Sequence, residues 1–164
     1  MKFKVQADKG WQDTGYKPGA QSGPYIIIRA SGDWHCRPGS IGARDANGRK
    51  PNSTLYIDSS SEGNTNYPLH EEGARIGMLI GKIGEEGDPF AVGDFRRIDH
   101  RNIPSDVSLF LRMNDNDDGL SDNSGSLDVE FSIGSGDTSR DHLVVPGYRG
   151  RSTGYKMAKG QKEY

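Results

Sequence analysis

The chain has 164 residues, enough for one domain with a sizeable core, but only 32% are hydrophobic, and 23 Gly and 8 Pro indicate many turns. Its net charge of −2 argues against general polyanion binding, and a single cysteine, Cys36, excludes an intrachain disulfide framework. No stretch approaches the roughly 20 apolar residues of a membrane span, and residues 1–11 show no conventional signal peptide. We expect a soluble protein, cytoplasmic or exported without such a signal.

Apolar residues at every second position predict the first strand. Phe3, Val5 and Ala7 alternate with polar residues, which is typical of a strand with one face in water. Residues 25–30 follow, and their Ile-Ile-Ile run is apolar on both faces. A strand that is buried on both faces lies inside a sheet, so we expect this strand to be central.

The middle of the chain is irregular. Residues 31–39 predict a loop, and residues 42–75 are so often interrupted by Gly, Pro, Asn and Ser that we interpret them as a long excursion. Residues 76–84 predict a strand whose Gly residues mark close backbone approach or a bulge. Residues 90–92 and 142–145 predict shorter strands. We find no internal repeat and no convincing segment with helical periodicity.

Two further strands are predicted late in the chain. Apolar residues alternate with mostly polar ones over residues 107–113 and again over residues 127–133. Short strands separated by Gly-rich turns are typical of all-β folds. We therefore predict a β-sandwich or a β-barrel, with a connecting loop at one end of a sheet.

That loop, residues 114–125 (NDNDDGLSDNSG, hereafter the acidic loop), holds four carboxylates and no Lys or Arg. Like charges repel, so a compact loop needs a neutralising partner, and a calcium ion with roughly 6–8 oxygen ligands is our first hypothesis. Asp115, Asp122 and Asn123 offer side-chain oxygens, and Gly119 can turn its carbonyl inward because it has no Cβ. The alternative is a polar hairpin, since these residue types favour turns.

Four segments together resemble the PA-I type (LecA-like) bacterial lectins, a family of calcium-dependent, galactose-binding β-sandwiches. They are the first strand through Trp11, residues 27–32, residues 77–84 and residues 114–126. The resemblance implies a jelly-roll-like, galactose-binding-domain-like sandwich over residues 1–134, with long loops and little helix. Residues 135–164 would form a C-terminal extension, a strand plus a basic tail that packs on the domain or on a partner.

The resemblance also implies which residues bind calcium. Asp115 would ligate the ion through its carboxylate, Gly119 would offer its carbonyl, and Asp122 and Asn123 would supply further side-chain oxygens. The family's other backbone ligand falls at Cys36, where the family has an aromatic residue. A carbonyl ligand depends on the backbone path, so this exchange does not remove it. Asp122 replaces the usual Asn, and its added negative charge favours the cation.

A sugar site around the ion is implied as well. Asp115, Asp122 and Asn123 would contact sugar hydroxyls while they hold the cation. In the family, a His and a Gln that precede the strand over residues 77–84 bind an exocyclic hydroxyl. Their nearest counterparts here are Lys50 and Ser53, followed by a longer insertion, so this part of the pocket is expected to differ.

Three residues near the implied site have two interpretations each. Trp34 would pack on the apolar face of a sugar, or it would be a core residue that closes the sandwich. His35 and His70 are candidate polar walls of the pocket, although a lone histidine in a loop is more often a surface residue. Cys36 with these histidines and His142 matches no common zinc spacing.

We therefore predict a calcium-dependent lectin rather than an enzyme, which binds galactose-containing glycans or galactosides as a homo-oligomer. A carbohydrate-binding or targeting module of a larger enzyme or nucleic-acid-acting system is one alternative, because the chain is basic from Arg140 onward. A glycoside hydrolase is another. No motif selects a pair of catalytic carboxylates, and neither G-x-S-x-G nor HExxH occurs.

Overall fold

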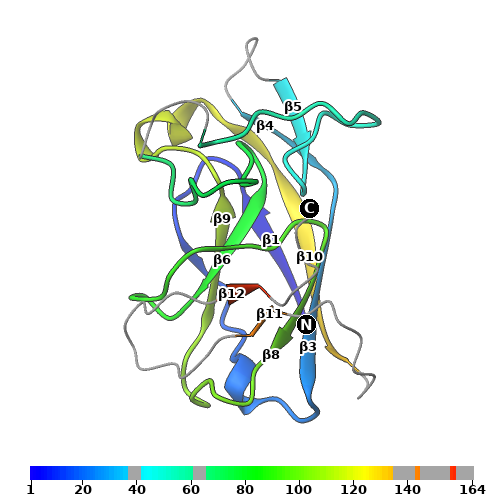
Figure 1. Cartoon of the computed structure of the whole chain (residues 1–164), viewed down its shortest axis with the longest axis vertical. Helices are drawn as coiled ribbons and strands as arrows, with labels where there is room; N and C mark the ends of the chain where they lie inside the picture. Colours follow the sequence, from blue (N-terminus) through cyan, green and yellow to red (C-terminus); the bar gives the residue numbers. More distant parts are fainter. Residues whose placement is uncertain (37–41, 61–65, 135–142, 145–155, 158–164) are drawn as a thin grey trace.

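The computed structural model describes residues 1–36, 42–60, 66–134, 143–144 and 156–157, and Figure 1 shows it along its shortest axis. Two β-sheets pack face to face, and the connections are long and irregular. The all-β sandwich expected from the sequence is confirmed. In the part of the chain that the structure describes, no helix is long and apolar enough to cross a membrane.

The strands of the larger sheet are ordered β12-β11-β8-β3-β10-β4-β5, with β1 also paired to β10, and the smaller sheet is ordered β2-β9-β6-β7. The strands are β1 Lys2–Gln6, β2 Gln12–Asp13, β3 Tyr25–Ser31, β4 Asp33–Cys36, β5 Gly42–Asp45, β6 Leu79–Ile83, β7 Phe90–Ala91, β8 Phe95–Asp99, β9 Leu109–Met113, β10 Ser124–Gly134, β11 Leu143–Val144 and β12 Lys156–Met157. Two 3₁₀-helices, η1 Pro18–Ala20 and η3 Asp117–Asp122, complete the described elements.

The main core lies between the inner faces of the two sheets. The larger sheet contributes Ile28, Val129 and Phe131, and the smaller sheet contributes Leu79 and Leu111, all of them buried. These residues occupy alternate positions of their strands, which is the pattern that predicted the strands. Removing this apolar surface from water is the main stabilising term of such a sandwich.

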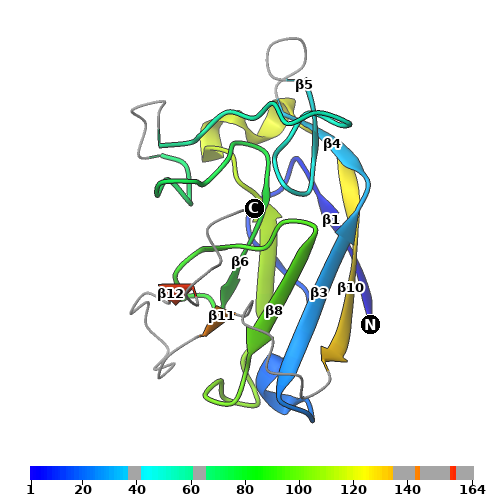
Figure 2. The same ribbon diagram turned by 45° about the vertical axis from the view of Figure 1, so that its right-hand side comes forward.

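Strand β10 organises the larger sheet because it pairs along both edges. On one edge it pairs first with β4 and then with β3, in a single register from Ser124 opposite His35 to Gly134 opposite Tyr25. Gly32 joins β3 to β4 with a φ of 101°, a backbone conformation that glycine adopts without steric cost. The β3–β4 unit therefore runs from the sheet directly to the acidic-loop end of the sandwich (Figure 2).

On its other edge, β10 pairs with β1, which is an edge strand. At the end of β1 the side chain of Gln12 takes the place of a further strand. Its Oε1 accepts the backbone N–H of Gln6 at 2.9 Å, and its Nε2 donates to the Gln6 carbonyl at 3.0 Å. The amide side chain of Gln12 thus satisfies both outward-pointing backbone groups of Gln6.

Most predicted strands agree with the structure, with shifted ends. The strand predicted over residues 25–30 is β3, and it is central as expected, between β8 and β10. Those predicted over 107–113 and 127–133 are β9 and β10. Within residues 76–84, the regular strand is limited to β6, because Gly77 has a φ of 81° that interrupts an extended strand.

Five of the described strands were not predicted, namely the two-residue strands β2 and β12 and the longer β4, β5 and β8. The expected loop over residues 31–39 is wrong at β4, where buried Trp34 and Cys36 alternate with exposed Asp33 and His35. The excursion over residues 42–75 begins with the regular strand β5, and isolated bridges such as Arg49 to Tyr56 follow. Strand β8 has the sequence FRRID, in which charged residues hide the alternation.

The C-terminal extension contributes two short strands to the larger sheet. Strand β11 pairs in parallel with β8, and β12 pairs with β11. The rest of the extension, including His142 and its basic residues other than Lys156, lies outside the described residues.

Candidate cation and sugar site

The acidic loop joins β9 to β10 at the end of the sandwich where β4 and β5 also lie, at the top of Figure 1. Residues 117–122 form the 3₁₀-helix η3 rather than a simple hairpin turn. Its side chains are not buried, whereas Asp115 before it and Asn123 after it are 5% and 6% exposed. The loop therefore buries one carboxylate and one amide side chain beneath an exposed polar turn.

Asp115 is the centre of this arrangement. Its Oδ2 accepts a hydrogen bond from Asn123 Nδ2 at 2.9 Å, and its Oδ1 accepts the backbone N–H of Asn116 at 2.8 Å. Gly119 lies directly over the carboxylate, since a Cβ added there would be 3.4 Å from each Asp115 oxygen. The absence of a side chain at Gly119 allows this close approach of backbone to carboxylate.

Cys36 lies next to Asn123. The last pair of the β4–β10 ladder is His35 opposite Ser124, and Cys36 and Asn123 are the next residues of the two segments beyond that pair. Their side chains also meet at Met113, whose Sδ is 3.2 Å from Cys36 Sγ and 3.4 Å from Asn123 Nδ2. The structure thus brings together four of the five predicted cation ligands. The fifth, Asp122, lies on the exposed last turn of η3.

A buried arginine neutralises part of the acidic loop. Arg112, the last residue but one of β9, is 2% exposed. Its Nη1 donates to Asp117 Oδ1 at 2.7 Å, and its Nη2 donates to the Asp115 carbonyl at 2.7 Å. The loop itself has no Lys or Arg, and its composition had suggested that an ion alone neutralises it. The contacts of Arg112 show that the protein itself neutralises part of its charge.

A second buried residue, Asn114, attaches the loop to the excursion. Its Nδ2 donates to the carbonyls of Leu69 and Arg75 at 2.8 and 3.0 Å, and its Oδ1 accepts the Leu69 N–H at 3.1 Å. Asn114 is completely buried, so these hydrogen bonds form out of water and fix the position of Asp115, the next residue.

The chemistry of these groups fits a hard cation. Carboxylate, amide and backbone carbonyl oxygens are the ligands that calcium takes in flexible geometry. Asn116 Oδ1 is a buried oxygen with no hydrogen-bond partner, and it lies 2.9 Å from the position of a Cβ on Gly119. The described residues contain no group of three His, Cys, Asp or Glu side chains around one point, so an ion here would depend on amide and carbonyl oxygens.

The residues predicted to contact the sugar differ in their exposure to solvent. Trp34 is fully buried, and its indole N–H donates to the Gly77 carbonyl at 2.7 Å. Its ring therefore presents no face to solvent, which corresponds to the second interpretation, a tryptophan in the core. His35 and His70 are exposed, and the His70 ring Nδ1 lies 3.0 Å from the Tyr67 carbonyl.

Lys50 and Ser53 form a turn on the excursion, in which the Ser53 N–H donates to the Lys50 carbonyl at 3.0 Å. Nearby, the Arg75 guanidinium stacks on Tyr56, with 4.2 Å between its Cζ and the ring centroid. Burial lowers the pKa of Arg75, and the charge of Arg49 lowers it further. Among the described contacts, none joins Lys50 or Ser53 to the acidic loop.

Three residues that shape the site were not predicted from the sequence, namely Arg112, Asn114 and Asn116. A signal for the first was present, because Arg112 is a charged residue in an otherwise apolar strand, LFLRM, directly before an acidic loop. The roles of the other two depend on segments distant in sequence or on burial, which a local pattern does not reveal.

No protein-family model matches the chain, and no curated protein matches it. Among solved structures, it is similar to one described as "EclA N-terminal domain; PllA-like lectin", with 23% sequence identity and a TM-score of 0.53. The match covers 79% of this chain and 92% of that chain. At this identity the likeness shows a shared fold, the β-sandwich described above.

Proposed function

We propose that this protein is a calcium-dependent lectin that recognises galactose-type sugars. The observation that carries the proposal is the buried carboxylate of Asp115, which is hydrogen-bonded to Asn123 and lies under Gly119. Cys36 adjoins this group, because its side chain and that of Asn123 both contact Met113. This donor set lies at one end of a β-sandwich that has the same fold as a lectin domain. The resemblance of the acidic loop to that of the PA-I type lectins supports the same function.

In this proposal, the cation is held by side-chain oxygens of Asp115, Asp122 and Asn123 and by the carbonyls of Gly119 and Cys36. Calcium would supply coordination positions at which two vicinal sugar hydroxyls replace water. The Asn123 side chain can present its oxygen rather than its nitrogen to a cation, because amide oxygen and nitrogen exchange places on a flip about χ2.

The protein groups then select the sugar. A carboxylate that accepts hydrogen bonds from sugar hydroxyls forms the stronger, charge-assisted kind of bond. The backbone at Asp115 is fixed by the hydrogen bonds of the preceding Asn114 side chain and by the bond from Arg112 to the Asp115 carbonyl, so the carboxylate would meet the diol in one orientation. A fixed acceptor of this kind distinguishes sugars by the stereochemistry of the two hydroxyls.

The exposed side chains of His35 and His70, with Lys50 and Ser53, would form the outer wall and contact the rest of the sugar. This wall differs from the His and Gln of the resembling family, so the preference among galactosides is expected to differ too. Glycan binding by a single shallow site is weak, and a homo-oligomer would raise avidity by roughly 10²–10⁴ where geometry allows.

The test is a glycan array probed with excess calcium and again with a chelator, followed by competition with galactose, N-acetylgalactosamine, glucose and mannose. We expect binding of galactose-terminated glycans that disappears with the chelator. Binding that persists unchanged in chelator would remove calcium from the proposal, and preference for mannose over galactose would remove the sugar class. A galactoside hydrolysis assay should show no turnover.

A further inference from the structure

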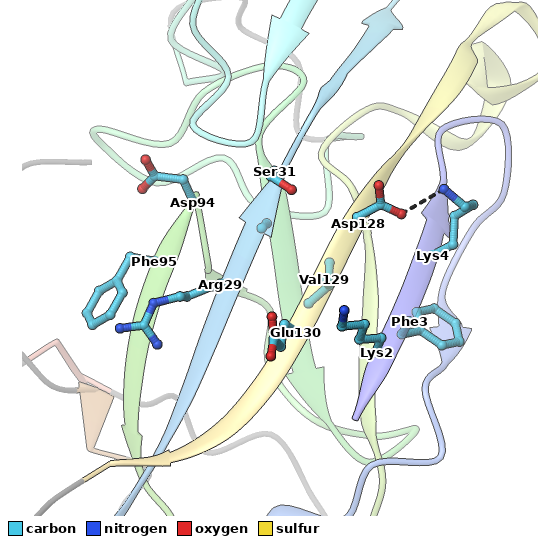
Figure 3. A pocket seen from close by; sticks show the side chains of 11 residues that line it. Lys2, Phe3, Lys4, Arg29, Ser31, Asp94, Phe95, Asp128, Val129 and Glu130 are labelled. Carbon is cyan, nitrogen blue, oxygen red and sulfur yellow. Dashed lines mark hydrogen bonds and ion pairs between the residues drawn. The ribbon is translucent and has the colours of Figure 1, made fainter.

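A large recess opens on the outer face of the larger sheet, away from the acidic loop. Its volume is ≈ 840 Å³, and its walls come from the neighbouring strands β1, β10, β3 and β8 (Figure 3). This volume is within the roughly 300–1,000 Å³ of typical ligand sites. None of the residues assigned above to the cation or the sugar lines it.

Strand register arranges the side chains of the recess in two rows. One row crosses four strands as Lys2, Glu130, Arg29 and Phe95, each opposite the next. All four are exposed, because alternate residues of these strands face the core. With strands about 4.8 Å apart, the row spans roughly 14 Å, so the recess suits an extended ligand that lies across the strands.

The second row begins with Lys4, Asp128 and Ser31, which lie opposite one another on β1, β10 and β3. The Lys4 ammonium contacts the Asp128 carboxylate at 2.7 Å, and Figure 3 shows this pair beside the first row. The hydroxyl of Ser31 lies between the charged side chains of the neighbouring strands in the same view. Donors and acceptors therefore alternate along both rows.

The charges of the recess balance. Its cationic side chains are Lys2, Lys4 and Arg29, and its carboxylates are Asp94, Asp128 and Glu130. An anionic ligand would meet three carboxylates, and a cationic ligand would meet three cations, so neither sign of charge is favoured. A neutral ligand rich in hydroxyl groups can use every one of these groups, because each hydroxyl both donates and accepts.

Two aromatic side chains line the recess, Phe95 and the partly buried Phe3, and Phe95 is the more exposed of the two. Phe95 is 42% exposed, and the Arg29 guanidinium lies over its ring with 5.1 Å between Cζ and the ring centroid. An apolar body beside polar groups is the composition that binds a sugar ring, which has C–H groups on its faces and hydroxyls at its edge.

We propose that this recess is a second carbohydrate site, which binds a neutral oligosaccharide across β1, β10, β3 and β8 without any metal ion. Phe95 would pack on the face of one sugar ring. Arg29, Glu130 and Lys2 would hydrogen-bond to hydroxyls along the chain of sugars. This site does not depend on the calcium site of the proposed lectin function, so each can be tested without the other.

The test is a titration of ¹⁵N-labelled protein, followed by NMR in the presence of chelator, with neutral tetrasaccharides of β-linked glucose, xylose and galactose as probes. We expect at least one of them to shift the amide signals of the two rows. Phe95→Ala should weaken that binding by at least about fivefold, the size expected for the loss of one ring contact. Asp115→Ala should leave it unchanged.

Ile133→Ala is the matched control, because Ile133 is 43% exposed on β10 and does not line the recess. Its affinity should equal that of the unmodified protein. The proposal is overturned if no probe shifts these amides at millimolar concentration, or if Ile133→Ala and Phe95→Ala weaken binding equally. It is also overturned if the same amides shift with protein concentration alone, which would indicate a second copy of the chain in the recess.

Discussion

The outer faces of the two sheets differ in what covers them. On the smaller sheet, Met78, Ile80 and Ala91 form a second apolar cluster with Leu69 and Ala74 of the excursion. On the larger sheet, the corresponding face between β1 and β8 carries exposed charged side chains and an open recess. The long excursion thus buries one face and, through Asn114, fixes the acidic loop, whereas the other face stays available to a ligand.

The largest effect should come from removing the carboxylate at the fixed loop. We expect Asp115→Ala to abolish retention on galactose resin and to leave the circular dichroism spectrum of the β fold largely intact, because the residue lies on the loop and outside the sheets. Asn123→Ala should act in the same way. Asp106→Ala removes an exposed carboxylate outside both proposed sites, so it is the control and should be retained. Retention of Asp115→Ala at the level of the unmodified protein would exclude Asp115 from the site.

The attachment of the excursion can be broken at Asn114. Asn114→Ala leaves the buried Leu69 N–H without its partner. It also removes one donor each from the carbonyls of Leu69 and Arg75, which still accept from Ser59 Oγ and from the Met78 N–H. We expect the free energy of unfolding to fall by about 2 kcal/mol, since one unpaired buried group costs roughly 1–3 kcal/mol. Urea unfolding measures this loss. A change below about 0.5 kcal/mol, typical of surface substitutions, would mean that the excursion does not depend on Asn114.

Calcium should stabilise the loop end of the molecule by a similar amount. An ion that binds only the folded protein adds about 2.7 kcal/mol at a concentration 100 times its dissociation constant. The melting temperature should therefore rise with calcium and fall again with chelator. Asp115→Ala should remove the difference, while Lys4→Ala should keep it. Identical midpoints for the unmodified protein under both conditions would contradict calcium binding.

The covered face should also show a pH effect through Lys82. Burial lowers the pKa of this lysine below 10.5, and it lies over the Trp11 ring with 4.8 Å between Nζ and the centroid. Between the folded pKa and 10.5, the unfolded chain binds more protons, so the contribution of Lys82 to stability rises with pH. Lys82→Met removes this titration. Its free energy of unfolding should exceed that of the unmodified protein by the largest margin at pH values below the folded pKa of Lys82. Urea unfolding from pH 8 to 10.5 measures the difference, and a difference that does not change with pH would refute the prediction.

The smallest effect is expected on the open face. Lys4 and Asp128 form an ion pair whose side chains are 56% and 72% exposed. Such pairs contribute about 0–1 kcal/mol, so Lys4→Ala should change the free energy of unfolding by less than about 0.5 kcal/mol. A much larger loss in urea unfolding would show that this face is built for stability rather than left open.

The contrast between the faces also explains which parts of the fold could be predicted. Alternation of apolar and polar residues identified β9 and β10, because each has one face in the core. It failed at β8, where Arg96 occupies a buried position and is only 5% exposed. A buried arginine depends on partners elsewhere in the chain, so local periodicity misjudges its strand.

The candidate site shows the same limit. Composition identified the acidic loop, and the resemblance selected Asp115, Gly119 and Asn123, which the structure brings together. The neutralising role of Arg112 was missed, because it depends on the side chain folding back under the loop. The burial of Trp34 could not be decided from sequence, since an aromatic residue in a short strand fits both a core and a sugar site.

The Gln12 side chain has a consequence for how copies of the chain meet. An unprotected edge strand recruits the strand of a neighbour, which is the first step toward fibrils. On β1, Gln12 already occupies the backbone groups of Gln6, and Lys2 and Lys4 occupy the remaining stretch of the edge. Two such edges aligned antiparallel with Lys2 opposite Lys4 would oppose lysine to lysine, which disfavours the addition of a second copy of the chain along β1.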